Sequence, residues 1–259
     1  MSIGPVNCEQ CSQRHRCSDR RVGELFGCFD YCVGRGDKAK CNLTCPFNEP
    51  EYSRRMMEVN WHMPLRGEVP DIEAGAVPPF HLPQVFGCTD RHTPLNVPWV
   101  AIPYYRLFRE VGRHRLEPVA TSPADLRLRF MLAPDTRIAG ISSGHDVHLE
   151  RMWEYYRVTD MAAALKAMGV SFATAPNFSF WTMAPRVHND WNFRRTALFT
   201  LRLWEGGFRM VPHLYAHRDA DWLDRAAFFV DHPHLDTFAF ELQTGDAASK
   251  HVPLLRRQM

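Results

Sequence analysis

The sequence predicts an α/β protein that carries a small cysteine-rich appendage, and three observations lead to this prediction. Apolar runs of strand length alternate with helical patterns from residue 136 onward. A proline-rich stretch precedes this alternation, and seven of the eight cysteines lie before it, between Cys8 and Cys45. Because strand, helix and strand follow one another, the strands are expected to be parallel, with helical crossovers between them.

The composition divides the chain into three zones. Residues 1–60 hold the cysteine cluster, residues 61–96 form a proline-rich connector, and residues 97–259 carry the β/α pattern. Proline fixes its backbone φ and lacks an N–H donor, so we expect the connector to run extended over the surface. With 259 residues and 45% hydrophobic content, the chain is long enough to bury one main core.

The third zone is predicted to alternate strands and helices. Its strands are expected over residues 97–102, 126–132, 137–142, 171–175, 208–214 and 235–242. Its helices are expected over residues 148–168, 188–204 and 220–230, where apolar residues repeat at helical spacing. Gly169 is suited to end the first helix, and Asp219 to open the last one.

This series of strands favours a partial or open TIM-barrel-like β/α domain. Six or so strands are fewer than the eight of a closed barrel. Residues 249–259 have the pattern of a helix that is just beginning, after which a closed barrel would need a further strand. The sequence leaves open whether the barrel is incomplete or the chain is shorter than its relatives.

The charged residues limit the function classes. The formal net charge is only +2, which is weaker than the electrostatic signature of a strong nucleic-acid binder. Of the 31 Lys and Arg residues all but four are Arg, a composition that a GC-rich genome also produces. The first ten residues lack a basic and apolar leader, and no apolar run is long enough for a membrane span. We therefore expect a cytoplasmic protein with no membrane contact.

The cysteines predict a metal site. In a reducing compartment, clustered thiolates bind metal more often than they form disulfides, and four of them close a tetrahedral site. Cys8 and Cys11 are separated by two residues, which is the spacing of a tight turn that directs both sulfurs to one ion. The candidate ligands are Cys8, Cys11, Cys17, Cys28, Cys32, Cys41, Cys45 and Cys88, and His15 or His62 could take the place of Cys88.

The identity and number of the metals stay open. Eight thiolates are enough for two four-thiolate sites, and Cys88 would then join the cysteine cluster to the β/α domain. Zinc is favoured over a [4Fe-4S] cluster because zinc sites tolerate varied spacing, whereas Pro46 directly after Cys45 favours the cluster. A closed four-thiolate site leaves no open position for a substrate, so we expect a structural metal.

Polar residues follow the predicted strands, at the positions where parallel α/β sheets collect their functional groups. We predict that they form one site for acid–base chemistry or for a divalent ion, made of His145, Asp146, Asn177, His213 and Glu241. Turns and helix caps use the same residue types, which is the simpler explanation for each of these residues taken singly.

A second polar group opens the helix predicted over residues 188–204. Backbone N–H groups at its start, together with Arg194 and Arg195, are suited to bind a phosphate. A capped helix start with a solvated arginine pair explains the same residues without a ligand. The chain has no Gly-x-Gly-x-x-Gly motif, Walker loop, Gly-x-Ser-x-Gly elbow or His-Glu-x-x-His motif, so none of those common sites is expected.

Two short motifs carry a resemblance to a known family. Ala-Pro-Asn-Phe-Ser at residues 175–179 is similar to that family's Ser-Pro-Asp-Phe-Ser turn, and Met-Val-Pro at residues 210–212 precedes Asp-Ala-Asp-Trp at residues 219–222. From about residue 97 to its end, the chain resembles an uncharacterised family found in phages, plasmids and bacterial chromosomes. The resemblance implies a mobile-element setting and a barrel-like β/α fold. Asn177 stands where the family usually has Asp, which removes a carboxylate from that position.

Three hypotheses for the function follow from the sequence. The first is a metal-containing enzyme of a mobile-element or phage-related system that acts on a nucleotide or nucleic acid. The second is a non-catalytic, metal-stabilised module that binds nucleic acid or a protein partner, which would need a contiguous arginine surface. The third is an iron–sulfur redox or radical enzyme.

Overall fold

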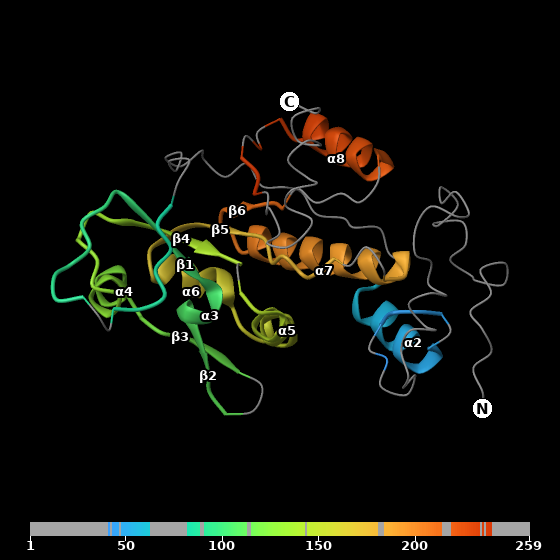
Figure 1. Ribbon diagram of the computed structural model, residues 1–259, viewed down its shortest axis with the longest axis horizontal. Helices are drawn as coiled ribbons and strands as arrows, with labels where there is room; N and C mark the ends of the chain where they lie inside the picture. The colour runs from blue at the N-terminus through green and yellow to red at the C-terminus, as the bar shows by residue number, and fades with distance from the viewer. Residues whose placement is uncertain are drawn as a thin grey trace.

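The computed structural model describes residues 41, 43–46, 48–62, 82–88, 91–112, 115–142, 144–180, 184–213, 219–233, 235 and 237–239. Within these residues the chain has a mixed α/β fold, in which helices flank a four-stranded parallel sheet (Figure 1). The predicted α/β class is thereby confirmed. The first forty residues and the helix start predicted over 249–259 lie outside the described residues.

The sheet consists of β1 (Trp99–Pro103), β4 (Arg137–Ile141), β5 (Val170–Thr174) and β6 (Met210–Val211). Neighbouring strands are parallel, and their order across the sheet, β1-β4-β5-β6, is their order along the chain. The strands predicted over 97–102, 137–142 and 171–175 are therefore confirmed. The strand predicted over 208–214 is shorter in the structure, with only Met210 and Val211 in the ladder.

Two single-residue bridges extend the sheet at both edges. Gln84 forms a parallel bridge with Ala101 in β1, and His213 forms one with Ala239 beyond β6. The Ala239 N–H donates to the Pro212 carbonyl at 2.8 Å. Six segments thus lie parallel and in chain order, although the strand predicted over 235–242 is reduced to Ala239 within the described residues.

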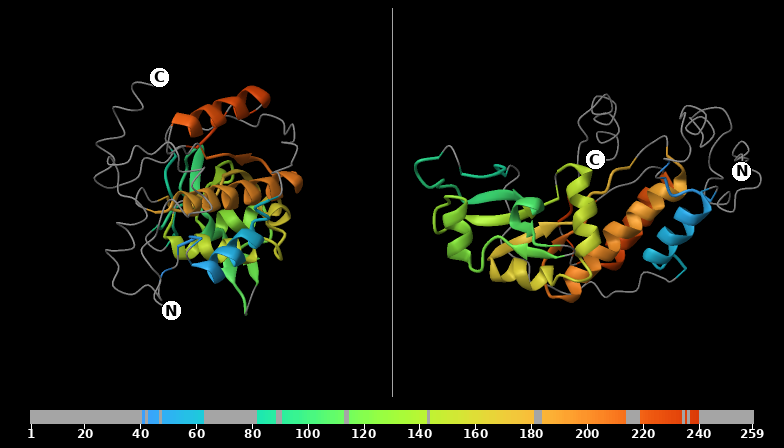
Figure 2. Two further views of the ribbon diagram at one scale, coloured as in Figure 1. Left: turned by 90° about the vertical axis from the view of Figure 1, so that its right-hand side faces the viewer. Right: turned by 90° about the horizontal axis from the view of Figure 1, so that it is seen from below.

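Seven helices are described, together with a short antiparallel pair formed by β2 (Phe108–Glu110) and β3 (Leu116–Pro118). The helices are α2 (Glu49–Glu58), α3 (Tyr104–Leu107), α4 (Pro123–Arg129), α5 (Asp146–Tyr155), α6 (Met161–Ala167), α7 (Arg186–Glu205) and α8 (Asp219–Asp231). Figures 1 and 2 show α2 beside the outer end of α7, away from the sheet. In the described part of the chain, no helix is long and apolar enough to cross a membrane.

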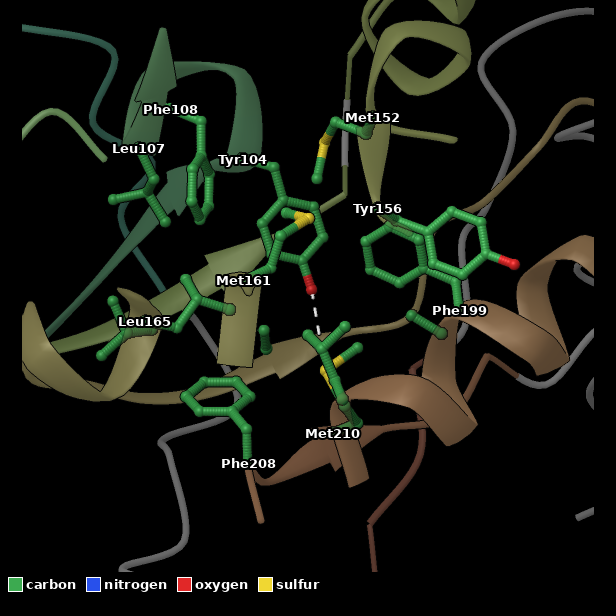
Figure 3. Packing of buried hydrophobic residues seen from close by; sticks show 14 of the residues in the cluster. Tyr104, Leu107, Phe108, Met152, Tyr156, Met161, Leu165, Phe199, Phe208 and Met210 are labelled. Atoms are coloured by element: carbon green, nitrogen blue, oxygen red, sulfur yellow. Dashed lines mark hydrogen bonds between the residues drawn. The ribbon is translucent and has the colours of Figure 1, made fainter. Parts of the chain in front are cut away.

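The helices cover one face of the sheet. Val100, Ile138 and Met210 point into a large core that also contains buried residues of α3, α5, α6 and α7. Figure 3 shows Tyr104 at the centre of this core, with its hydroxyl directed toward Met210. The opposite face carries a separate small cluster of Trp99, Ala139, Phe172 and Val211, which is joined by Leu82 and Ala239 from the two edge segments and, among the residues that the structure describes, by no helical residue.

The strand predicted over residues 126–132 is wrong, because these residues mostly belong to α4. The alternation of Leu and Arg imitates a strand, but Ser122 caps a helix here, and its hydroxyl accepts from the Asp125 N–H at 3.2 Å. Leu126 and Phe130, four residues apart, are buried, while Leu128 is 78% exposed. The helical period therefore decides which apolar residues face the core.

The single helix predicted over residues 148–168 is also wrong, since the structure has two helices there. The first helix, α5, ends at Tyr155, and α6 begins at Met161. Asp160 caps the second helix by accepting from the Ala163 N–H at 3.0 Å. Gly169 follows the end of α6 with a φ of +71°, a conformation that favours glycine at this position.

Candidate functional site

Three polar side chains meet at the carboxyl edge of the sheet. Ser142 directly follows β4, Thr174 is the last residue of β5, and His213 lies two residues after β6. The Ser142 hydroxyl oxygen lies 3.2 Å from His213 Nε2, and the Thr174 hydroxyl donates to the same serine oxygen at 3.2 Å. Because three neighbouring parallel strands end at one edge, they bring together residues that are far apart in sequence. We call Ser142, Thr174 and His213 the edge trio.

The edge trio is partly shielded from solvent, and this shielding determines the protonation state of His213. Ser142 is 4% exposed, and burial lowers the pKa of His213 to about 4. The imidazole is therefore neutral near pH 7, with one nitrogen able to accept a proton. The other ring nitrogen, Nδ1, is buried and has no hydrogen-bond partner among the described residues. In the tautomer with Nε2 unprotonated, the Ser142 hydroxyl donates to His213.

Two further bonds fix the ends of β4 and β5 relative to each other. The Ser142 backbone N–H donates to the Thr174 hydroxyl oxygen at 3.0 Å. The Tyr104 hydroxyl, fully enclosed in the core, donates to the Thr174 carbonyl. Burial raises the pKa of Tyr104 well above its ordinary value, so the hydroxyl keeps its proton. Tyr104 thus fixes the position of Thr174, the residue that contacts Ser142.

A second contact joins the loops that follow β4 and β5. The Ser179 hydroxyl donates to the carboxylate of Asp146 at 2.7 Å, and the Asn192 side-chain amide of α7 donates to the Ser179 carbonyl at 2.8 Å. Asp146 is the first residue of α5, and His145 precedes it with an exposed side chain. Asn177 lies in the loop after β5 and is half-buried.

The structure therefore places four of the five predicted catalytic residues at the carboxyl edge or in its loops. It brings His213 into the edge trio and joins Asp146 to Ser179, while His145 and Asn177 lie in the same two loops. Glu241 lies outside the described residues. The catalytic role of all five stays a prediction.

The two arginines predicted to bind phosphate are engaged in contacts within the protein. Arg195 is 2% exposed and donates to both carboxylate oxygens of Glu150, at 2.6 and 2.9 Å. Its guanidinium lies between the rings of Phe178 and Trp191, 3.8 and 3.7 Å from their centroids. Arg194 donates to the Val59 and Asn60 carbonyls, both at 2.6 Å. Both guanidinium groups are thus bonded within the protein, to a carboxylate or to backbone carbonyls, and phosphate binding by these arginines stays a prediction.

The described end of the cysteine-rich zone is docked on α7. The Thr44 backbone N–H donates to His188 Nδ1 at 3.1 Å, and Arg55 donates to the Thr44 hydroxyl at 3.0 Å. The Arg55 guanidinium also lies 4.4 Å from the ring centroid of Trp191. Burial, with help from the positive charges of Arg55 and Arg195, lowers the pKa of His188 to about 3. This histidine is therefore a neutral acceptor that anchors the segment.

Of the predicted metal ligands, three lie among the described residues. Cys45 is buried, and Cys41 and Cys88 are half-buried. Within the described ranges, no three His, Cys, Asp or Glu side chains gather in a way that could hold a metal ion. Any site that includes Cys41, Cys45 or Cys88 would therefore need donors from outside the described residues, which is where the other five predicted cysteine ligands lie, namely Cys8, Cys11, Cys17, Cys28 and Cys32.

The sequence did not single out Ser142, Thr174 or Tyr104 as site residues. Serine and threonine are common at strand ends, so only the pairing of β4 with β5 distinguishes these two. Tyr104 directly follows β1. A tyrosine at the end of a buried apolar run is the feature of the sequence that could have indicated its role. Comparisons with known proteins add nothing to this site, because no family model, curated protein or solved structure matches the chain.

Proposed function

We propose that the chain is an enzyme whose reaction centre is the edge trio, with His213 as general base and Ser142 as the hydroxyl that it activates. The observation that carries this proposal is the 3.2 Å contact between His213 Nε2 and the Ser142 hydroxyl at the carboxyl ends of parallel strands. A neutral imidazole within hydrogen-bond reach of a serine hydroxyl is one arrangement by which proteins activate a nucleophile.

In this role Nε2 takes the hydroxyl proton while Ser142 Oγ bonds to the electrophilic atom of the substrate. The bond between that atom and the leaving group breaks, and the protonated imidazole gives its proton to the leaving group. Water, deprotonated by the same imidazole, then attacks the covalent intermediate, the bond to Ser142 Oγ breaks, and the imidazole gives the proton back to the serine. The Thr174 hydroxyl donates to Ser142 Oγ, which directs the serine proton toward His213. Ser142 is buried, and Thr174 and His213 are half-buried, which limits the access of solvent to the serine hydroxyl.

The substrate class that we propose is a nucleotide or nucleic acid. Support comes from a chain in which arginine almost replaces lysine, because the guanidinium fork pairs with phosphate oxygens. We also propose that the sheet is part of an open barrel. Six parallel segments follow chain order without a reversal, and the buried helical residues lie on one face.

For the cysteine-rich zone we propose a structural metal, with zinc favoured and a [4Fe-4S] cluster as the alternative. Cys45 is buried where this zone docks on α7, so a metal held there would stabilise the docked segment. Elemental analysis of protein purified without oxygen tests this proposal. Zinc in a colourless protein supports it, iron with sulfide supports the alternative, and the absence of any bound metal contradicts both.

The decisive test of the enzyme proposal is turnover of a panel of nucleotides and single-stranded DNA and RNA by four variants. Ser142→Ala and His213→Gln should each abolish product formation. Ser171→Ala and His92→Gln are the matched controls, since both side chains are exposed and lie outside the edge trio, and they should leave the rate unchanged. Binding of the panel without turnover by the wild-type protein would contradict the enzyme proposal and favour a non-catalytic binding module.

A further inference from the structure

A stack of two half-buried aromatic rings lies at the same edge of the sheet as Ser142. The rings of Tyr105 and His148 are parallel to within 12°, with their centroids 4.3 Å apart. Tyr105 belongs to α3, which directly follows β1, and His148 lies near the start of α5, which follows β4. Helices α3 and α5 contact each other, so the stack joins the ends of two neighbouring strands.

Positive charge surrounds this stack. The Arg106 guanidinium lies 5.3 Å from the Tyr105 ring centroid, and the His145 ring lies 6.4 Å from that of His148. The pKa of His148 is lowered first by burial and then by the charges of Arg151, His145 and Arg106. Three basic side chains therefore lie close enough to one half-buried ring to affect its pKa. We call Tyr105, Arg106, His145, His148 and Arg151 the ring ledge.

The acidic side chains near the ring ledge pair with some of its basic side chains but not with Arg106 or His145, as far as the structure describes them. Glu110 pairs with Arg151 at 3.7 Å and accepts from the Tyr155 hydroxyl at 2.9 Å. Asp146, on the same helix, accepts from Ser179. Within the part of the chain that the structure describes, no carboxylate forms a salt bridge with Arg106 or His145, and both side chains are exposed. These two side chains are therefore available to an anionic ligand.

The backbone next to the ledge is adapted to the tyrosine ring. A Cβ atom on Gly144 would lie 3.1 Å from Tyr105 Cε1, which is closer than ordinary van der Waals contact. Gly144 is two residues after Ser142, so the loop that leaves the edge trio runs directly past Tyr105. The ledge and the trio are thus parts of one continuous edge.

We propose that the ring ledge binds a nucleotide, with the base against the Tyr105–His148 stack and the phosphate at Arg106 and His145. This inference rests on the proposed function, for which the ledge supplies a substrate subsite beside the reacting serine. Bases stack on aromatic side chains whatever their sequence, and arginine donates to phosphate oxygens through two parallel N–H groups. The ligand is either a free nucleotide or a nucleotide within a single strand.

The test is equilibrium binding by the full chain of a fluorescently labelled ten-nucleotide oligothymidylate and, separately, of unlabelled AMP by calorimetry. Tyr105→Leu and Arg106→Gln should each weaken binding by about tenfold, since one stacked base or one phosphate contact is lost. Arg106→Gln should also reduce the salt dependence of oligonucleotide binding by about one released ion. Arg129→Gln, an exposed arginine at the end of α4, is the matched control and should bind within about twofold of wild type.

The outcomes separate this inference from the proposed function. Because the substituted side chains are partly or fully exposed, circular dichroism should show all three variants folded. Ser142→Ala should retain binding, since the serine acts in the reaction and not in the ledge. Binding of oligothymidylate alone assigns the ledge to single strands, and binding of AMP as well assigns it to the nucleotide unit. The proposed role of the ring ledge would be contradicted if wild type bound neither ligand, or if Arg129→Gln lost as much affinity as Arg106→Gln. This holds whatever the turnover assay gives.

Discussion

His188 and His213 are two buried imidazoles that the fold keeps neutral. Burial lowers the pKa of His188 to about 3 and that of His213 to about 4, whereas an unfolded chain has a histidine pKa near 6.5. Below pH 6.5 the unfolded state therefore binds protons that the folded state does not. Both histidines contribute stability that is fully present above this pH and is lost as the pH falls toward 4.

The stability that the two histidines lose at low pH can be measured. The free energy of unfolding should fall between pH 7 and pH 5, with a slope of up to about 1.4 kcal/mol per pH unit for each histidine. Urea unfolding of His188→Gln should show a shallower slope than wild type, because glutamine does not titrate. Equal slopes in the two proteins would show that His188 is protonated to the same extent in the folded and unfolded states.

The second residue-scale prediction concerns Tyr104. Its hydroxyl donates to the Thr174 carbonyl inside the core, so Tyr104→Phe leaves that carbonyl without this donor. The substitution should lower the free energy of unfolding by about 1–2 kcal/mol. Tyr105→Phe is the control, because the neighbouring hydroxyl is not enclosed in the core and its loss should cost little. Equal effects of the two changes would contradict the role given to Tyr104.

At the scale of elements, α7 organises the molecule beyond the sheet. In its first turns, His188 accepts a hydrogen bond from Thr44, and Trp191 contacts the Arg55 guanidinium. Further along the helix, Arg195 pairs with Glu150 of α5. Arg194 donates to carbonyls at the end of α2, where a helix leaves its last carbonyl groups without internal partners. One helix thereby connects the end of the cysteine-rich zone to the loops around the edge trio.

This connection predicts the effect of removing Arg194. Arg194→Ala should destabilise the protein by about 1–3 kcal/mol, because two hydrogen bonds from a charged donor are lost. Hydrogen exchange should show the loss as faster exchange in α2, with the strands unchanged. Arg202→Ala on the exposed side of the same helix is the control. Unchanged exchange in α2 would mean that Arg194 does not hold this helix.

The elements also show what the sequence could predict. Strands β4 and β5 were predictable because short apolar runs between polar turns fit few other structures. Helix α7 was predictable because its apolar residues keep helical spacing over a long stretch. The Leu-Arg alternation before Phe130 fits a strand locally, and only the Ser122 cap with Pro123 reveals the helix. The break between α5 and α6 depends on Asp160, a cap that helical spacing alone does not show.

For the whole molecule, the edge of the sheet is where sequence reasoning was most useful. The rule that function collects beyond the carboxyl ends of parallel strands pointed to His213 and Asp146, and both lie at that edge or in its loops. It did not reveal Ser142 or Thr174, since their contacts depend on which strands are neighbours. For Arg195 the sequence offered a phosphate ligand or a solvated arginine pair, and neither explanation includes the packing of Phe178 and Trp191 around its guanidinium. Long-range partners are not visible in local composition.

The proposed chemistry depends on a neutral His213 bonded to Ser142 at the sheet edge. The most direct test is an NMR titration of the histidine ring nitrogens, with His213→Gln to assign the signals. We expect His213 to stay neutral to about pH 4 and its Nε2 signal to shift in Ser142→Ala. A His213 ring that titrates near pH 6.5 and does not respond to the loss of the serine hydroxyl would contradict the proposed site.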